Sequence, residues 1–226
     1  MTDVYVLVEG ETEKRFIEMV LAPYCSHMGV FLHPTLVHGQ KNRLKGGGDV
    51  KFLRVKEDIA RFLKQRDDTL VCTFVDYYGI KEWPNLEGAR NQRDPAKIAA
   101  LMNSGAVQEM CASFPDLHCI ERRYKPYTAV HEFETLLLSN PQILAEQLGV
   151  EPEEVQLIVE SAGGPEYVNN SPQTAPSKRM EEWSQHGLGT SYKKTLQGIT
   201  IAEKIGINAM RASCPLFDAW LKQLGV

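Results

Sequence analysis

The sequence lacks the features that mark several large classes of protein. Its five cysteines include no C-x-x-C pair, so neither a disulfide framework nor a zinc knuckle is predicted, and a reducing compartment is favoured. No apolar run approaches the roughly 20 residues of a membrane-spanning helix. The N-terminal apolar run, residues 4–8, ends in Glu9 and is too short for a signal peptide. These absences predict a cytoplasmic protein without a membrane segment.

Several catalytic and nucleotide-binding motifs are absent as well. There is no G-x-x-x-x-G-K-[ST] phosphate loop, although three glycines stand at 46–48, and no G-x-G-x-x-G fingerprint. The lack of a G-x-S-x-G elbow disfavours an α/β-hydrolase, and the lack of H-E-x-x-H spacing leaves a zinc protease unsupported. The formal net charge of −4 excludes a generally basic surface, so any nucleic acid must meet a local basic patch.

What the sequence does contain is an alternation of apolar runs and amphipathic segments. Four runs predict strands, the last by alternation: residues 4–8, 30–37, 70–75 and 118–124. Helices are predicted between them: about 13–24 behind a Thr12 cap, 49–64 behind an Asp49 cap, and one opened by Asp94-Pro95. This order predicts an α/β fold, with a parallel or mostly parallel sheet and helices on both faces.

The rest of the chain is predicted to be mainly helical. The expected helices are 131–139, 141–148, 152–161, 178–186, 195–205 and 215–224, with a loop at 163–177. A length of 226 residues suits one domain. We therefore expect a single domain over 1–226, with an α/β core at 1–130 and a mainly helical extension at 131–226.

Two acidic residues directly follow predicted central strands. Glu9 ends the first strand and Asp76 ends the third, at the edge where open α/β sheets bind ligands. Glu13 can point back to this edge from the next helix. The alternatives are that Glu13 only complements the helix N-terminus and that Asp76 only caps a turn. Because hard cations prefer oxygen ligands, the acids together predict a site for Mg²⁺ or Mn²⁺.

A further acidic segment, His131-Glu132-Phe133-Glu134, lies where strand gives way to helix. Glu132 and Glu134 are two residues apart, so at least one of them is expected to reach the metal site. His131 is a candidate proton shuttle or partner of a metal ligand, and the alternative is a structural histidine.

Basic residues supply candidate contacts to phosphate. Lys178 follows a loop rich in hydroxyl and amide groups and can neutralise charge that develops in phosphoryl transfer. The alternative is a solvated helix start with Ser177 as its cap. The wider set of candidate nucleic-acid contacts, which are alternatively ordinary solvated charges, is Lys41, Arg43, Lys45, Arg122, Arg123, Lys178 and Arg179.

The motifs VEGETE at 8–13 and VDYYG at 75–79 resemble the two acidic motifs of Toprim domains, with the second acid four residues after the first as in the OLD family. Together with the segments at 131–134, 174–179 and 201–206, they make nearly the whole chain resemble the bacterial domain-of-unknown-function family 4276, a Toprim-like group. The resemblance implies a Toprim-like fold and a site built on Glu9, Glu13, Asp76 and the Glu132/Glu134 pair. It also implies Lys178 as the lysine of OLD-type nucleases, and a partner ATPase in phage defence.

One departure from the Toprim pattern is Tyr78, which stands where a second aspartate is usual, so the number of metal ions stays open. The first hypothesis is an Mg²⁺- or Mn²⁺-dependent nuclease acting on DNA or RNA. Its cation would sit on Glu9, Asp76 and Glu132 or Glu134, Glu13 would take a proton from water, and Lys178 would stabilise phosphate oxygens. The alternatives are a non-catalytic interaction or sensor module and a phosphoryl-transfer enzyme acting on free nucleotides. The sequence does not fix the oligomeric state.

Overall fold

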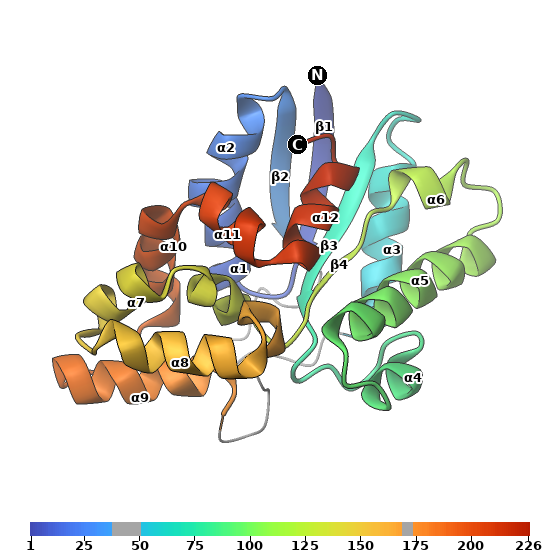
Figure 1. Cartoon of the computed structure of the whole chain (residues 1–226). Helices are drawn as coiled ribbons and strands as arrows, with labels where there is room; N and C mark the ends of the chain where they lie inside the picture. Colours follow the sequence, from blue (N-terminus) through green and yellow to red (C-terminus); the bar gives the residue numbers. More distant parts are fainter. Residues whose placement is uncertain (38–50, 169–173) are drawn as a thin grey trace.

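The computed structural model describes residues 1–37, 51–168 and 174–226, and in these ranges a four-stranded, all-parallel sheet forms the centre of the fold (Figure 1). In spatial order the strands are β2 (Val30–Leu36), β1 (Thr2–Val8), β3 (Leu70–Asp76) and β4 (Tyr127–Ala129). Val8 of β1 pairs with Phe74 of β3, so these two strands end side by side. The predicted α/β class, with a parallel sheet between helices, is confirmed.

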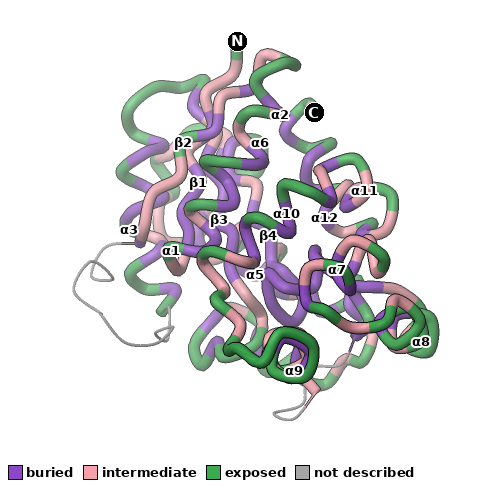
Figure 2. Tube along the Cα trace, turned by 90° about the vertical axis from the view of Figure 1, so that its left-hand side faces the viewer, coloured by how far each residue is buried: buried purple, intermediate pink, exposed green. Residues whose placement is uncertain are grey.

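The central strands alternate their side chains between two apolar cores. Val4, Val6 and Val8 pack into the core on one face of the sheet, whereas Leu7 packs into the core on the other face. Because both faces are covered, β1 needs apolar residues at successive positions, which explains its continuous apolar run. Figure 2 shows the resulting band of buried residues through the middle of the protein.

One face is covered first by a continuous helical segment that follows β1. It consists of α1 (Glu11–Phe16), the π-helical η1 (Ile17–Leu21) and α2 (Ala22–Ser26). The predicted cap is wrong: Gly10 occupies the N-cap of α1, and Thr12 lies inside the helix. Thr12 is buried and its hydroxyl lies 3.1 Å from that of Thr195, so the residue joins two elements instead of starting one.

The other face is covered by α3 (Phe52–Leu63), α4 (Leu86–Arg90) and α5 (Pro95–Ser113). As predicted, α5 begins at Asp94-Pro95, and the carboxylate of Asp94 caps it by accepting a hydrogen bond of 2.9 Å from the main-chain N–H of Ala96. The predicted cap Asp49 lies outside the described residues. The sequence pattern does not predict α4.

The predicted strand at 118–124 is wrong. This segment contains α6 (Ile120–Arg123), and the fourth strand, β4, follows it. Ile120 and Tyr124 are both buried and four residues apart, a spacing that one helical turn also places on one face. Over so short a segment the apolar pattern does not separate a strand from a helix.

The C-terminal half is mainly helical, as predicted. Its elements are η2, a 3₁₀ helix (Phe133–Ser139), α7 (Pro141–Leu148), α8 (Pro152–Ala162), η3 (Pro165–Tyr167), α9 (Pro176–Leu188), η4 (Lys194–Gly198), α10 (Ile199–Ile205), α11 (Ile207–Ser213) and α12 (Pro215–Gln223). The predicted helix at 195–205 corresponds to η4 and α10, and α11 is not predicted by the sequence pattern.

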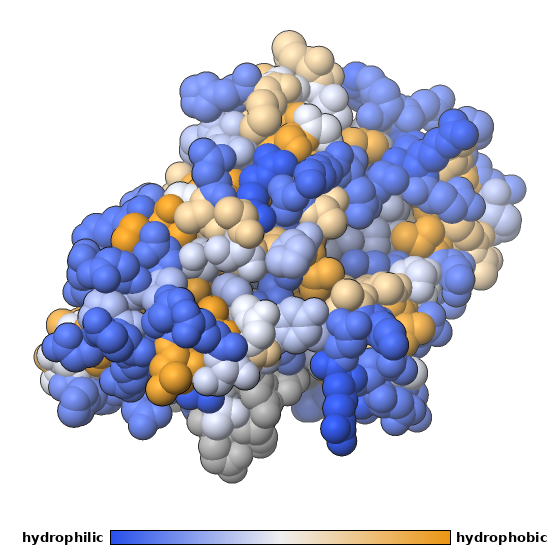
Figure 3. Space-filling model, in the orientation of Figure 1, coloured by the Kyte–Doolittle hydropathy of each residue, from blue (hydrophilic) through white to orange (hydrophobic). Residues whose placement is uncertain are grey.

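The C-terminal helices share a core with the sheet. Trp220 of α12 stacks on Tyr127 of β4 with 4.9 Å between ring centroids, and Phe217 lies 6.3 Å from Phe16 of α1. Figure 1 accordingly shows α12 lying across one face of the strands. On the face seen in Figure 3, exposed apolar residues are scattered among polar ones. In the described ranges no helix combines the length and the apolarity needed to cross a membrane.

Candidate functional site

Three acidic side chains meet at the carboxyl edge of the sheet. Asp76 is the last residue of β3, Glu13 lies in the first turn of α1, and Glu134 lies in the first turn of η2. Since β1, β3 and β4 run parallel, the segments that leave them emerge at the same edge. Together with Lys194, these three residues are called the acidic cluster below.

Lys194, the first residue of η4, is the centre of the acidic cluster. Its Nζ lies 3.0 Å from Glu134 Oε2, 3.7 Å from Glu13 Oε1 and 3.7 Å from Asp76 Oδ2. The contact between the hydroxyls of Thr12 and Thr195 joins α1 to η4 beside these ion pairs. The lysine is therefore held against the acids by its neighbours in the chain as well as by charge.

Burial sets the protonation of the cluster. The side chain of Glu134 is 0% exposed and that of Asp76 is 13% exposed, whereas that of Lys194 is 33% exposed. Burial raises the pKa of Asp76 well above its ordinary value despite the charge of Lys194, and the neighbouring acids add to the rise. Burial also raises the pKa of Glu134. Asp76 and Glu134 therefore retain protons at a pH where isolated carboxyl groups have lost them.

The negative charges of the acids stabilise the charged form of Lys194. Burial by itself lowers the pKa of Lys194, but the charges of Glu134, Asp76 and Glu13 outweigh it, so the pKa lies well above its ordinary value. Lys194 thus stays positively charged across the physiological range and is the cation that neutralises the acids.

The oxygen atoms of the cluster fit a hard divalent cation by their chemistry. Asp76 Oδ1 and Glu134 Oε1 are buried and accept no hydrogen bond from the described residues, which is a costly state for carboxylate oxygens. Their arrangement is different from that of a metal site, because they surround Lys194 Nζ. In the described part of the chain, no three His, Cys, Asp or Glu side chains are already grouped to hold a metal ion. Ligand distances of about 2.0–2.1 Å for Mg²⁺ therefore require the Lys194 ammonium to move aside.

Glu132 has a different role from Glu134. Its two carboxylate oxygens accept hydrogen bonds from the main-chain N–H of Ser177 at 2.8 Å and from the Ser177 hydroxyl at 2.9 Å. The carboxylate thus sits at the N-terminal turn of α9, where helix dipoles favour negative charge. Of the two glutamates, Glu134 is the one that faces the cluster, because Glu132 is still extended and Glu134 is already helical.

Glu9 and Gly10 border the cluster at the end of β1. Glu9 is partly exposed, and its charge contributes to the raised pKa of Asp76. A Cβ atom at Gly10 would come within 2.9 Å of Glu13 Oε2. The glycine therefore leaves room for the carboxylate of Glu13.

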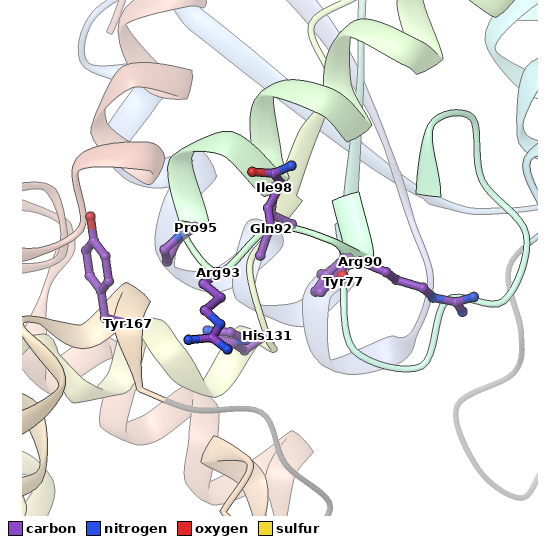
Figure 4. Close-up of a pocket in the computed structure, with 8 residues that line it drawn as sticks. All are labelled: Tyr77, Arg90, Gln92, Arg93, Pro95, Ile98, His131 and Tyr167. Atoms are coloured by element: carbon purple, nitrogen blue, oxygen red, sulfur yellow. The ribbon is translucent and has the colours of Figure 1, made fainter. Parts of the chain in front are cut away.

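His131 lies near the same strand ends but in a cavity of its own. The residue has φ 83°, is 7% exposed, and its Nδ1 has no hydrogen-bond partner among the described residues. Burial lowers its pKa to about 4, so its ring is neutral at physiological pH. It helps to line a cavity of about 430 Å³ shown in Figure 4. The role of His131 as a proton shuttle stays a prediction.

Comparison with known proteins identifies one family. The family described as Domain of unknown function (DUF4276) matches residues 8–225 of this chain. The chain belongs to this family. No curated protein and no solved structure matches it significantly. The matched range includes the whole acidic cluster, so the cluster lies within the DUF4276 region.

Among the described residues, the predicted basic contacts of this DUF4276 chain do not gather at the cluster. Lys178 is exposed on α9, and Arg179 donates to the carbonyl of Thr174 at 3.1 Å. Arg123 is buried and donates to four main-chain carbonyls, those of Leu63, Arg66, Thr69 and His118. Its prediction as a nucleic-acid contact is therefore wrong, whereas Arg122 is exposed. Lys41, Arg43 and Lys45 lie outside the described residues.

Lys194 is the site residue that the sequence reasoning missed, since Lys178 was assigned its role. A signal was present: a lysine at the first position of a helix opposes the helix dipole. Such local conflicts concentrate at functional sites. Tyr192, two residues earlier, was missed too. Its buried hydroxyl has no hydrogen-bond partner among the described residues, and the charge of Glu134 contributes to its raised pKa after burial.

Proposed function

We propose that this DUF4276 chain is a cytoplasmic, metal-dependent phosphodiesterase of Toprim type that cleaves DNA or RNA with Mg²⁺ or Mn²⁺. The observation that carries the proposal is the convergence of Glu13, Asp76 and Glu134 on Lys194 at the carboxyl edge of a parallel sheet. Phosphodiester cleavage needs carboxylates to hold a cation and a positive group to face the phosphate. The cluster contains both kinds of group within ion-pair distance.

Asp76 and Glu134 would hold the cation, with Glu9 beside them at the end of β1. Asp76 and Glu134 each have one buried oxygen without a hydrogen-bond partner among the described residues. When bound, the cation would polarise the phosphodiester and lower the pKa of a water molecule. Glu13 keeps the predicted role of accepting a proton from that water molecule.

Lys194 takes over the role that the sequence analysis gave to Lys178. Its side chain is one third exposed, so the ammonium can turn toward a phosphate once the acids are neutralised by a cation or by protons. An ammonium at that point opposes the negative charge that develops on the phosphate oxygens. Ion pairing in the absence of substrate keeps the lysine charged and close to the reacting position.

A Toprim relationship is supported by the acids after the first and third strands of a parallel sheet. Tyr78, which stands in place of the usual second aspartate, is 38% exposed and does not belong to the cluster. Glu134, in η2 after the neighbouring strand β4, contributes a further carboxylate beside Asp76. We therefore propose one cation, held by Asp76 and Glu134 with Glu9 beside them. The nucleic-acid partner, a partner ATPase and a role in phage defence are parts of the same proposal.

The second candidate function is a non-catalytic interaction or sensor module. The ion pairs of Lys194 favour it, because they neutralise the acids without a metal ion. In this case the cluster would stabilise the edge of the sheet and contribute nothing to chemistry.

A cleavage assay on plasmid, single-stranded DNA and RNA with Mg²⁺ or Mn²⁺ separates the two functions. The wild type is compared with Glu134→Gln and Asp76→Asn, and with Asp58→Asn as a matched control. Asp58 is also a buried acid, but it lies on α3 and pairs with Arg61 at 3.1 Å. We expect metal-dependent cleavage by the wild type and the control and none by the cluster variants.

Thermal unfolding with and without metal completes the assay, because a ligand that binds the folded state raises Tm. Cleavage by both cluster variants would contradict the assigned site. If the wild type neither cleaves nor gains stability with either metal, the interaction module is the better reading.

A further inference from the structure

The cavity lined by His131 lies beside the acidic cluster at the carboxyl edge of the sheet. It has a volume of about 430 Å³, within the range of small-molecule sites. Its lining is mainly polar and aromatic and includes Tyr77, Gln92, Arg93, Ile98, His131 and Tyr167 (Figure 4).

The cavity and the cluster are built on the same two strand ends. Tyr77 follows Asp76 directly, and His131 precedes Glu134 by three residues. The main-chain N–H of Tyr77 donates to the carbonyl of Ala129, and that of Tyr78 to the carbonyl of His131, both at 2.9 Å. Tyr77 packs against the apolar core on the side of the sheet that α5 covers, and its neighbour Asp76 belongs to the acidic cluster. A ligand that extends across this edge of the sheet would therefore contact both the cavity and the cluster.

His131 indicates that the cavity is made for a ligand. Its ring is almost fully buried, it lines the cavity, and Nδ1 has no hydrogen-bond partner among the described residues. Its φ of 83° is an uncommon backbone state for a residue with a side chain, and such states concentrate at ligand sites. A ring nitrogen in this position can form a hydrogen bond with a polar group of a ligand in the cavity.

Arg93 provides the charge that selects the ligand. It is exposed at the cavity and forms no ion pair with the described residues, and in Figure 4 its side chain extends in the direction of His131. Arg90, also in the lining, is less available, because it donates to the carbonyl of Ile80 at 3.1 Å and points away from the others in Figure 4. A guanidinium without an acidic partner is suited to a phosphate, which it can bind through two parallel hydrogen bonds.

The remaining lining suits a planar ring. Tyr77 and Tyr167 offer aromatic faces, Ile98 an apolar surface, and Gln92 an amide that can both donate and accept. We propose that the cavity binds one nucleotide unit, with its phosphate at Arg93 and His131 and its base against the tyrosines. This inference rests on the proposed function and extends it. Only an unstacked base can reach such faces, so the substrate is single-stranded nucleic acid or a strand end.

Equilibrium binding in EDTA, without metal and without cleavage, tests the inference. The probes are adenosine 5′-monophosphate, adenosine and inorganic phosphate. We expect the wild type to bind the monophosphate more tightly than either fragment. Arg93→Ala should weaken monophosphate binding about tenfold or more, as expected for a lost charge-assisted hydrogen bond. Arg54→Ala, which removes an exposed arginine of α3 outside the cavity, should bind like the wild type.

Tyr167→Leu separates the two halves of the ligand. It should weaken binding of the monophosphate and of adenosine and leave phosphate binding unchanged, and thermal unfolding verifies that each variant is folded. The inference is overturned if the monophosphate does not bind, if Arg93→Ala binds it as the wild type does, or if phosphate alone binds equally well. Monophosphate binding by a chain that cleaves nothing would contradict only the proposed function. Cleavage without monophosphate binding would contradict only the cavity assignment.

Discussion

The ammonium of Lys194 lies 3.0 Å from a carboxylate oxygen of Glu134, whose side chain is fully buried. The two residues come from different helices, η4 and η2, and each helix begins at its member of the pair or one residue before it. This contact fixes the position of η4 against the carboxyl edge of the sheet. It also keeps a buried negative charge neutralised, which is the condition for holding several acids in one place.

Lys194→Met should destabilise the protein at neutral pH, because it leaves Glu13, Asp76 and Glu134 without a cation. Loss of one partner of a fully buried pair costs ~3–5 kcal/mol, and the partial exposure of Lys194 reduces the expected loss to about 2–3 kcal/mol. Urea unfolding at pH 7 measures it. The loss should shrink as the pH is lowered, since protonation neutralises the acids. A variant that is equally destabilised at all pH values would show that packing, not charge, is the role of Lys194.

Glu134→Gln and Glu132→Gln should separate two glutamates that the sequence pattern leaves equivalent. Glu134→Gln should abolish the rise of Tm on addition of Mg²⁺ or Mn²⁺, since it removes a proposed cation ligand. Glu132→Gln should retain that rise and lose about 1 kcal/mol of stability, because its carboxylate binds Ser177 at the start of α9. Thermal and urea unfolding measure both effects. An equal metal response in the two variants would contradict the assignment.

Arg123→Ala should destabilise the fold by about 3 kcal/mol, because it removes a buried guanidinium and leaves main-chain carbonyls unpaired. Arg122→Ala, at the exposed neighbouring position, should change stability by less than about 0.5 kcal/mol. Chemical unfolding of both variants measures the difference. If the two changes have the same small effect, the buried hydrogen bonds of Arg123 do not stabilise the protein.

Glu166 should make stability depend on pH. It is 3% exposed and accepts hydrogen bonds from the main-chain N–H groups of Leu216 and Phe217, and burial raises its pKa from 4.5 to about 7. Because the folded pKa lies above the unfolded one, its contribution is fully present below pH 4.5 and is lost as the pH rises to about 7. The loss is on the order of 3 kcal/mol.

Glu166→Gln should therefore flatten the pH dependence of the free energy of unfolding across this window. Urea unfolding of the wild type and the variant at a series of pH values measures the slope. Asp76 and Glu134 titrate in both proteins, so the difference between the slopes isolates Glu166. Parallel curves would show that Glu166 titrates normally in the folded state.

The strands β1 and β3 were predictable because they have continuous apolar runs and are covered on both faces. Their neighbours in the sheet did not need to be known, since burial on two faces demands such runs whatever the order. The segment at 118–124 was misjudged because a short apolar spacing suits one helical turn as well as a strand. Only the packing of Arg123 against the carbonyls around α3 and β3 decides between them.

The acids of the site were predictable in part. Asp76 and Glu13 follow strand ends, and an ionisable group directly after a buried strand is itself a signal. Lys194 gave a weaker signal, because its ion pairs join residues that lie far apart in the sequence. Lys178 and Lys194 are both lysines near a helix start, so the conflict with the helix dipole marks both, and only the packing shows which one reaches the acids.

The sequence by itself determined the α/β class, the parallel sheet and the edge at which acids gather, because burial and periodicity are properties of single segments. Only the tertiary structure decided which charged groups contact one another. It turned Glu134 toward the cluster, paired the Glu132 carboxylate with Ser177, buried Arg123 and brought Lys194 to the three acids. The physical reason is that the energy of a buried charge depends on its partners, and partners are chosen when helices pack, not when they form.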